Sequence, residues 1–225
     1  MLGPVIGDLL PSALGVALSP FPIVAVILLL TTPRGRANGP AFAVGWVVGL
    51  TVLCLLVLWL AGGSDDPDSD TSTAVDVLQL VLGLGLLAVA KKQWDKRPVP
   101  GEAPVLPKWM DTLQDFDVPR ALAVGVALAA VNPKNLALTL AGAAAIAQGG
   151  LSAGGDAVAI AVFVLLASMT VIGPVLSYLL LGKRVEPGLV SLRQWMADNN
   201  ATIMTVVCVI LAAKLVGAGI AGLSN

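Results

Sequence analysis

Long apolar segments separated by short polar connections run along the whole chain. Six of them approach or exceed the roughly 20 residues that a helix needs to cross a bilayer. They cover residues 9–31, 39–61, 74–90, 120–147, 153–182 and 199–222. Because 57% of the residues are hydrophobic and the mean hydropathy is +0.90, little sequence is left for a water-soluble domain. The pattern predicts an all-α, polytopic membrane protein with six transmembrane helices.

Prolines interrupt the first and the fourth of these segments. The first break consists of Ser19, Pro20, Phe21 and Pro22, and the second break consists of Asn132, Pro133, Lys134 and Asn135. A proline inside a helix removes a backbone hydrogen bond, and in lipid the freed groups are tolerated only where protein or water surrounds them. Breaks at corresponding positions of two halves are typical of a transporter's binding site. We therefore predict a transporter with broken first and fourth helices.

The basic residues fall in alternate connections. Eleven of the 13 Lys and Arg residues do so: Arg34, Arg36, Lys91, Lys92, Lys96, Arg97, Lys108, Arg120, Lys183, Arg184 and Arg193. An excess of Lys and Arg marks the cytoplasmic connections of a membrane protein. We expect a multi-pass protein of the plasma membrane, with three basic connections in the cytoplasm and both termini outside.

Three spans in each half predict an inverted repeat, because an odd number of spans makes related halves enter the membrane from opposite sides. Gly15-Val16-Ala17-Leu18 and Gly125-Val126-Ala127-Leu128 precede the two breaks and support this prediction. The expected organisation is a first three-helix repeat over 1–90, a cytoplasmic linker over 91–119 and a second, inverted repeat over 120–225.

Apolar residues at helical spacing occur in the linker and again in the last cytoplasmic connection. They are Trp109, Met110, Leu113 and Phe116 in the linker, and Leu189, Leu192, Trp195 and Met196 in the later connection. Such a pattern is typical of a short amphipathic helix lying on a membrane surface. We expect both segments to anchor the protein at the inner interface.

Two lysines lie inside predicted spans, where a charge costs several kcal/mol and normally marks a pathway. Lys134 belongs to the second break, and its candidate partners are freed carbonyls, Asn132, Asn135 or an anionic group of the substrate. Lys214 lies in the outer part of the sixth span, where its stem can also reach the interface. Helix restarts present N–H groups that attract anions. We expect both breaks, with Lys134 and Lys214, to bind a substrate that carries a carboxylate, phosphate or sulfate.

The predicted spans also contain hydroxyl-bearing residues that could serve the site and small residues that could allow close helix packing. The hydroxyls near the expected site are those of Thr31, Thr139, Ser168, Thr170 and Ser177. They can contribute hydrogen bonds to it, although helical Ser and Thr more often bond back to their own backbone. Gly45 and Gly49 have the spacing that allows close helix packing. This spacing leaves homo-oligomerisation open.

Several absences narrow the function. The chain has no histidine, and Cys54 and Cys208 lie inside spans, apart from both breaks. The two cysteines therefore indicate packing rather than a disulfide or a zinc site. We find no nucleophile–base pair and no phosphate-binding glycine loop. We expect no enzymatic activity, no cofactor, no metal and no nucleic-acid partner.

At both breaks the sequence resembles a known superfamily. The first break resembles the T/S-P-G-P element of the lysine exporter (LysE) superfamily, and Asn132-Pro133-Lys134 resembles the N-P-K element of its homoserine/threonine exporter branch. Ala17–Ile23 and the second break make the chain most similar to the GAP family, the peptidoglycolipid or sulfolipid addressing proteins of actinobacteria. That resemblance implies glycolipid movement across the plasma membrane beside a larger lipid exporter. Phe21 replaces the glycine of the amino-acid exporters, which argues against their exact substrate pocket.

Three functions follow from these observations. The first is an exporter of a polar lipid or glycolipid with an anionic or polar headgroup, working by alternating access. The second is an exporter of amino acids or similar small amphipathic solutes. The third is a membrane adaptor that transports nothing itself and stabilises a lipid-export machine. An adaptor is expected to tolerate loss of the Lys134 side chain, whereas a carrier is not.

Overall fold

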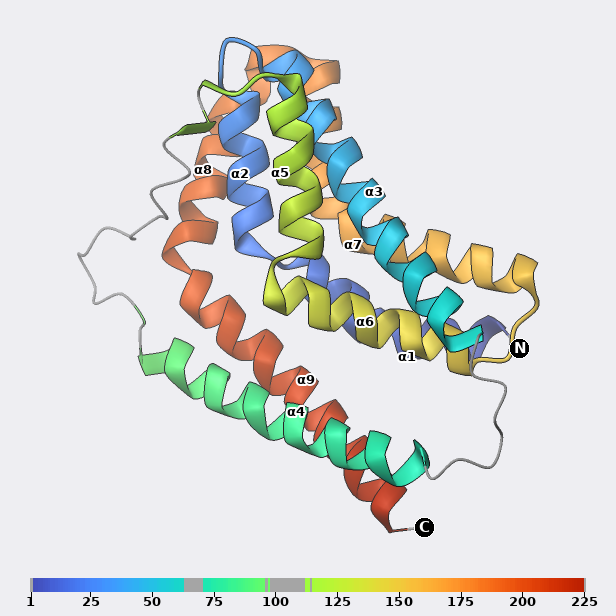
Figure 1. The fold of residues 1–225 in the computed structure, drawn as a ribbon. Helices are drawn as coiled ribbons and strands as arrows, with labels where there is room; N and C mark the ends of the chain where they lie inside the picture. Colours follow the sequence, from blue (N-terminus) through green and yellow to red (C-terminus); the bar gives the residue numbers. More distant parts are fainter. Residues whose placement is uncertain (1, 63–70, 96, 98–111, 114, 225) are drawn as a thin grey trace. The chain divides into compact units, whose positions relative to one another are not determined.

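The computed structural model describes residues 2–62, 71–95, 97, 112–113 and 115–224, and these residues contain helices and no strand (Figure 1). Three of the described helical stretches are long and apolar enough to cross a membrane, and the number rises to five if each of two bent helix pairs is one span. The all-α membrane fold is confirmed to this extent. Six spans and the inverted repeat stay predictions.

The chain forms two compact units. Unit 1 comprises Met1–Gly63 and Val105–Ala197, and unit 2 comprises Ser64–Pro104 and Asp198–Asn225. Each unit thus takes residues from both predicted repeats, and both breaks lie in unit 1. The predicted repeat boundaries stay a prediction.

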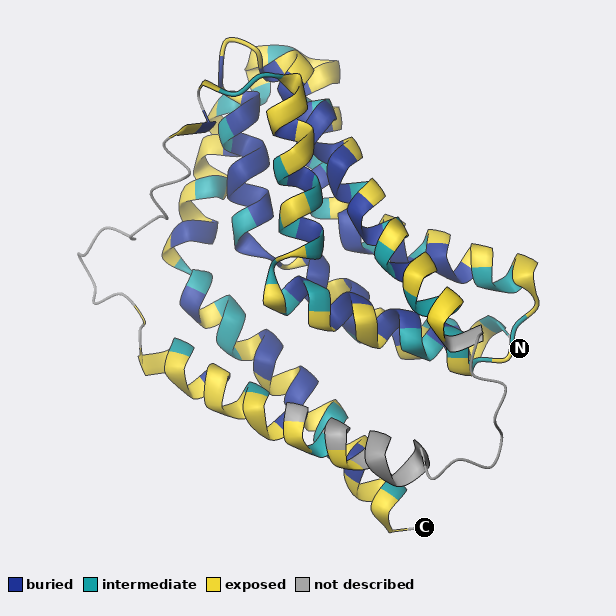
Figure 2. Ribbon diagram, viewed as in Figure 1, coloured by how far each residue is buried: buried dark blue, intermediate teal, exposed yellow. Residues whose placement is uncertain are grey.

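Unit 1 contains seven of the described α-helices and the 3-10 helix η2. They are α1 (Leu2–Ala17), α2 (Pro20–Leu30), α3 (Gly35–Gly62), α5 (Val118–Ala130), α6 (Pro133–Gln148), α7 (Ala153–Leu181), η2 (Gly182–Val185) and α8 (Glu186–Asp198). α2 forms the core of this unit, because all its residues except Phe21 and Leu28 are buried (Figure 2). A helix that is apolar all round is stable only inside protein or lipid, and α3, α5 and α7 cover α2.

Glycines bring α3 and α5 into close contact, as their spacing predicts. A Cβ atom on Gly45 would overlap the carbonyl oxygen of Leu122, and one on Gly125 would overlap that of Phe42. One turn further, a Cβ on Gly49 would lie 2.9 Å from the Cβ of Ala129. The backbones therefore approach more closely than any other residue type allows at Gly45 and Gly125.

The basic connections of unit 1 gather at one end. Figure 1 shows the α2–α3 connection, the start of α5 and η2 at that end, and the α6–α7 connection at the opposite end. Exposed basic residues occupy the first end, among them Arg34, Arg120 and Lys183. At the opposite end, Val5 near the N-terminus contacts Gly149. The basic connections of unit 1, which alternate along the sequence with connections that lack Lys and Arg, thus lie together at one end.

The two predicted amphipathic segments are described in part. On α8, Leu189 and Met196 are buried, whereas Leu192 and Trp195 are exposed, so one face of this helix packs on protein and the other stays open. In the linker, Leu113 is buried, and the Phe116 carbonyl accepts a hydrogen bond from Asn38 Nδ2 at 2.7 Å. Trp109 and Met110 lie outside the described residues.

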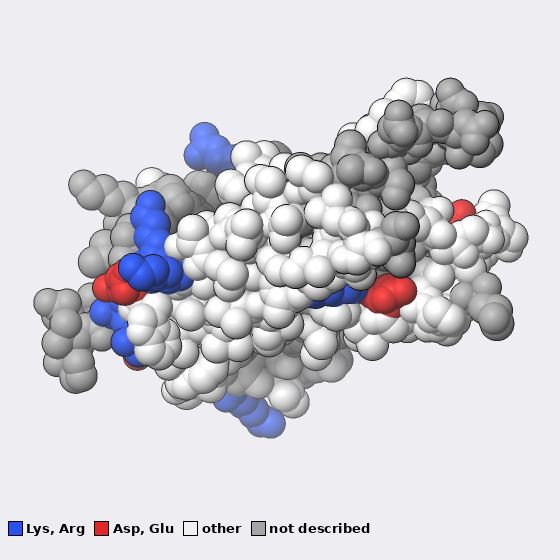
Figure 3. All heavy atoms as spheres, turned by 90° about the horizontal axis from the view of Figure 1, so that it is seen from below, with Lys and Arg blue, Asp and Glu red and all other residues white. Residues whose placement is uncertain are grey.

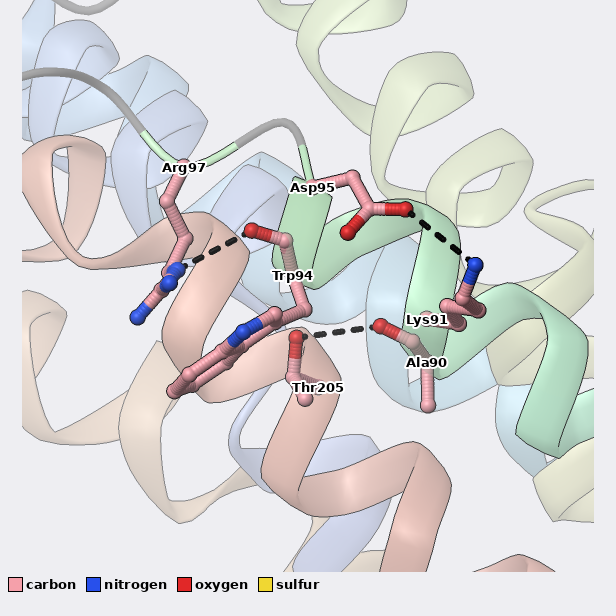
Figure 4. A network of polar contacts seen from close by, with 6 residues as sticks. All are labelled: Ala90, Lys91, Trp94, Asp95, Arg97 and Thr205. Atoms are coloured by element: carbon pink, nitrogen blue, oxygen red, sulfur yellow. Dashed lines mark hydrogen bonds and ion pairs between the residues drawn. The ribbon is translucent and has the colours of Figure 1, made fainter.

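Unit 2 consists of α4 (Thr71–Asp95) packed against α9 (Asn200–Leu223). A Cβ on Gly83 would lie 2.7 Å from Val216 Cγ2, so this glycine lets the two helices meet. At the end of α4, the Arg97 guanidinium lies 3.2 Å from the centre of the Trp94 ring (Figure 4). Aromatic and basic residues at a helix end are typical of a membrane–water interface.

The described surface carries large apolar side chains in unusual number for a protein in water. Figure 3 shows one face on which most of the described surface is uncharged. Leu180, Trp59 and Val131 are 82%, 73% and 72% exposed, respectively. Exposure on this scale is unfavourable in water and suits contact with lipid. The surface supports membrane association, as the composition predicts.

Candidate functional site

Each proline break separates two helices that meet at an angle. The bend is 51° between α1 and α2 and 65° between α5 and α6. Ser19 and Asn132 adopt extended backbone conformations as N-caps, and a proline follows each of them at the first helical position. Proline disfavours a helical conformation in the residue before it and fits the first position of a new helix. Local sterics therefore place both bends where the sequence predicts them.

A buried hydrogen bond joins the two breaks. Ser19 Oγ donates to Asn135 Oδ1 at 3.0 Å, across 116 residues of sequence. The two residues are 2% and 0% exposed, respectively. The two breaks therefore meet within unit 1, and their use as a substrate site stays a prediction.

Side chains also satisfy a carbonyl group that each break frees. In a continuous helix, the carbonyl four residues before Asn132 would accept that residue's N–H. Here the Leu128 carbonyl accepts a hydrogen bond from Asn135 Nδ2 at 3.1 Å. At the first break, the Ala17 carbonyl accepts one from Thr170 Oγ1 at 2.5 Å. Asn135 and Thr170 thus stabilise the two bends.

The helix restarts offer fewer free N–H groups than the sequence suggests. Since proline has no N–H, Phe21 supplies the only one among the first three residues of α2. On α6 the Lys134 N–H already donates to Asn132 Oδ1 at 3.2 Å. An anion at the second break would therefore depend chiefly on the Lys134 ammonium, whose Nζ atom is buried.

The remaining predicted site residues differ in exposure. Pro20 and Pro22 are buried, Phe21 is half-buried, and Pro133 is exposed. Lys214 is exposed on α9 and belongs to unit 2. The described contacts thus bring together Ser19 and the residues of the second break, and the assignment of Lys214 to the site stays a prediction.

Four buried polar atoms in unit 1 have no hydrogen-bond partner among the described residues. They are Asn38 Oδ1, Trp46 Nε1, Thr139 Oγ1 and Ser168 Oγ, and all four residues are 0% exposed. The sequence identified the two hydroxyls as candidates. It gave no sign of the indole, because a tryptophan within an apolar span ordinarily indicates packing.

Comparison with known proteins places the chain in a family. The sequence model of the family described as Sap, sulfolipid-1-addressing protein, matches residues 9–221. No curated protein and no solved structure matches the chain. The matched range covers both breaks, and it confirms the resemblance to addressing proteins, while membership of the LysE superfamily stays a prediction. The chain belongs to the sulfolipid-1-addressing protein family.

Proposed function

We propose that this protein exports a polar lipid or glycolipid with an anionic headgroup across the plasma membrane. The observation that carries the proposal is the buried hydrogen bond between Ser19 and Asn135, which joins two helix breaks inside an apolar helical unit. Broken helices that meet in a membrane protein are typical of substrate sites. The family description supports this choice of substrate, because a sulfolipid carries an anionic headgroup.

Lys134 is the residue that we assign to the charge of the headgroup. Its Nζ atom is buried, and a buried ammonium favours a nearby anion strongly because the surroundings screen charge weakly. The prolines and Phe21 shape the first break, and Asn132 and Asn135 hold the second. The acyl chains of a lipid would remain against the apolar surface while the headgroup passes the breaks.

Alternating access around the breaks is the mechanism that we propose. In support of an inverted repeat, α1, α2 and α3 correspond in order to α5, α6 and α7, because in each set a bent helix pair is followed by one long helix. The two sets also pack against each other symmetrically. Helices α1 and α2 of the first set both contact the long helix α7 of the second set, and α5 and α6 of the second set both contact the long helix α3 of the first. Related halves can adopt two equivalent arrangements around a fixed site.

Surface-extractable lipids test the proposal in three strains: wild type, a deletion, and the deletion complemented with Lys134→Ala. A carrier that uses Lys134 predicts loss of one lipid class from the surface, and its accumulation inside, in both altered strains. Full rescue by Lys134→Ala would instead support an adaptor of a lipid-export machine. An unchanged lipid profile in all three strains would refute the lipid proposal and favour export of amino acids.

A further inference from the structure

Two buried hydroxyls lie on α6 and α7, each a few residues along its helix from a side chain that stabilises a break. Thr139 follows Asn135 by four residues on α6, which is about 6 Å along the helix axis. Ser168 precedes Thr170 by two residues on α7, about 3 Å along the axis, and Thr170 donates to the Ala17 carbonyl at the first break. Measured along the helix axis, each of the two residues therefore lies within about one turn of a residue that stabilises a break.

The packing of α6 against α7 places the two hydroxyls at a similar level. A Cβ on Gly142 would touch the ring of Phe163, so these residues mark one point of contact between the two helices. The helices run in opposite directions, joined by the connection 149–152 (Figure 1). Three residues back along α6 lead to Thr139, and five residues forward along α7 lead to Ser168. Both steps run toward the breaks.

The hydrogen-bonding capacity of these hydroxyls is unused within the described part of the chain. A helical threonine normally donates to the carbonyl of the preceding turn, as Thr51 does to Val47 at 2.8 Å. Thr139 and Ser168 do not, although both are 0% exposed. A packing role would be served as well by valine or alanine, and leaving a buried hydroxyl unpaired lowers stability. The two groups are suited to a ligand that enters the site.

We propose that Thr139 and Ser168 bind hydroxyl groups of a sugar-bearing headgroup during transport. The inference rests on the proposed function and specifies its substrate class. A serine or threonine hydroxyl both donates and accepts hydrogen bonds, and so does a sugar hydroxyl. Lys134 then balances the charge of the headgroup, and the two hydroxyls select a glycosylated headgroup over a simple anionic one.

The test uses variants that remove a hydroxyl with little change of shape. Thr139→Val and Ser168→Ala are introduced singly into the full chain and expressed in the deletion strain. Thr51→Val is the matched control, because its hydroxyl is satisfied within its own helix. We expect each site variant to lower the surface glycolipid by roughly two- to tenfold, the effect of one lost hydrogen bond. Thr139→Ser, which keeps the hydroxyl, and Thr51→Val should export at the wild-type level.

Protein amount and melting temperature separate binding from a structural role. Replacing an unpaired buried hydroxyl by an apolar group should leave Tm unchanged or raise it. Export that falls only in proportion to the amount of folded protein would overturn the inference. Full export by both variants, with export still lost in Lys134→Ala, would overturn the inference and leave the proposed function standing. An unchanged lipid profile in the deletion strain itself would overturn both.

Discussion

Removing the Asn135 side chain should destabilise the protein through two hydrogen bonds at once. Asn135→Leu keeps the size of the side chain, but it leaves the Ser19 hydroxyl and the Leu128 carbonyl without their partner. In water-soluble proteins, each buried donor or acceptor left without its hydrogen-bond partner lowers the free energy of unfolding by about 1–3 kcal/mol. Hydrogen bonds between membrane helices average only about 0.6 kcal/mol and reach about 1.7 kcal/mol. The membrane figures apply here, so we expect a loss of about 1–3 kcal/mol for two bonds.

The bond between the breaks can be isolated by a double-mutant cycle. Ser19→Ala removes that bond alone, and Ser19→Ala with Asn135→Leu removes both partners. The coupling free energy between the two sites should be about 0.6–1.7 kcal/mol. The measurement is reversible unfolding of the purified protein in detergent micelles, followed by circular dichroism. Strictly additive effects of the two substitutions would refute the hydrogen bond as a link between the breaks.

Three further predictions follow from the same packing. Thr170→Val leaves the Ala17 carbonyl unpaired and should lower the free energy of unfolding by about 0.6–1.7 kcal/mol. Thr51→Val, measured in the same unfolding assay, should cost less. Equal losses in the two variants would contradict the role given to Thr170. Gly45→Ala forces a Cβ onto a backbone carbonyl and should cost about 1–3 kcal/mol, whereas Gly85→Ala, with open space around it, should be neutral or stabilising in thermal unfolding. Cysteines introduced at Arg34 and at Ser152 should react with an impermeant maleimide from the cytoplasmic and the outer side, respectively. Background labelling should be low because the native cysteines are buried. Labelling from the reverse sides would contradict the proposed orientation.

Features that depend on neighbouring residues were predictable from the sequence. A proline restricts its own backbone and that of the residue before it, so Pro20 and Pro133 predict where the bends occur. The spacing of Gly45 and Gly49 likewise predicts a close contact, because only the absence of a Cβ allows it. These effects act within one turn, so a single sequence is enough to recognise them.

Features that depend on how distant helices pack were not predictable. Ser19 and Asn135 were both expected at the site, but their bond depends on the packing of helices 116 residues apart in sequence. The hydroxyl of Thr170 was expected to serve the site or its own helix, and the sequence did not indicate that its partner is the Ala17 carbonyl at the first break. The grouping of α4 with α9 crosses the two predicted repeats for the same reason.

Transfer by the purified protein alone tests the central claim most directly. The protein is reconstituted into liposomes made from the total lipid of the deletion strain, and the appearance of glycolipid in the opposite leaflet is followed by accessibility to periodate. We predict transfer by the wild-type protein, slow transfer by Lys134→Ala, and wild-type transfer by Thr51→Val. Absence of transfer by a wild-type protein that restores lipid export in cells would contradict the claim that this chain is itself the carrier.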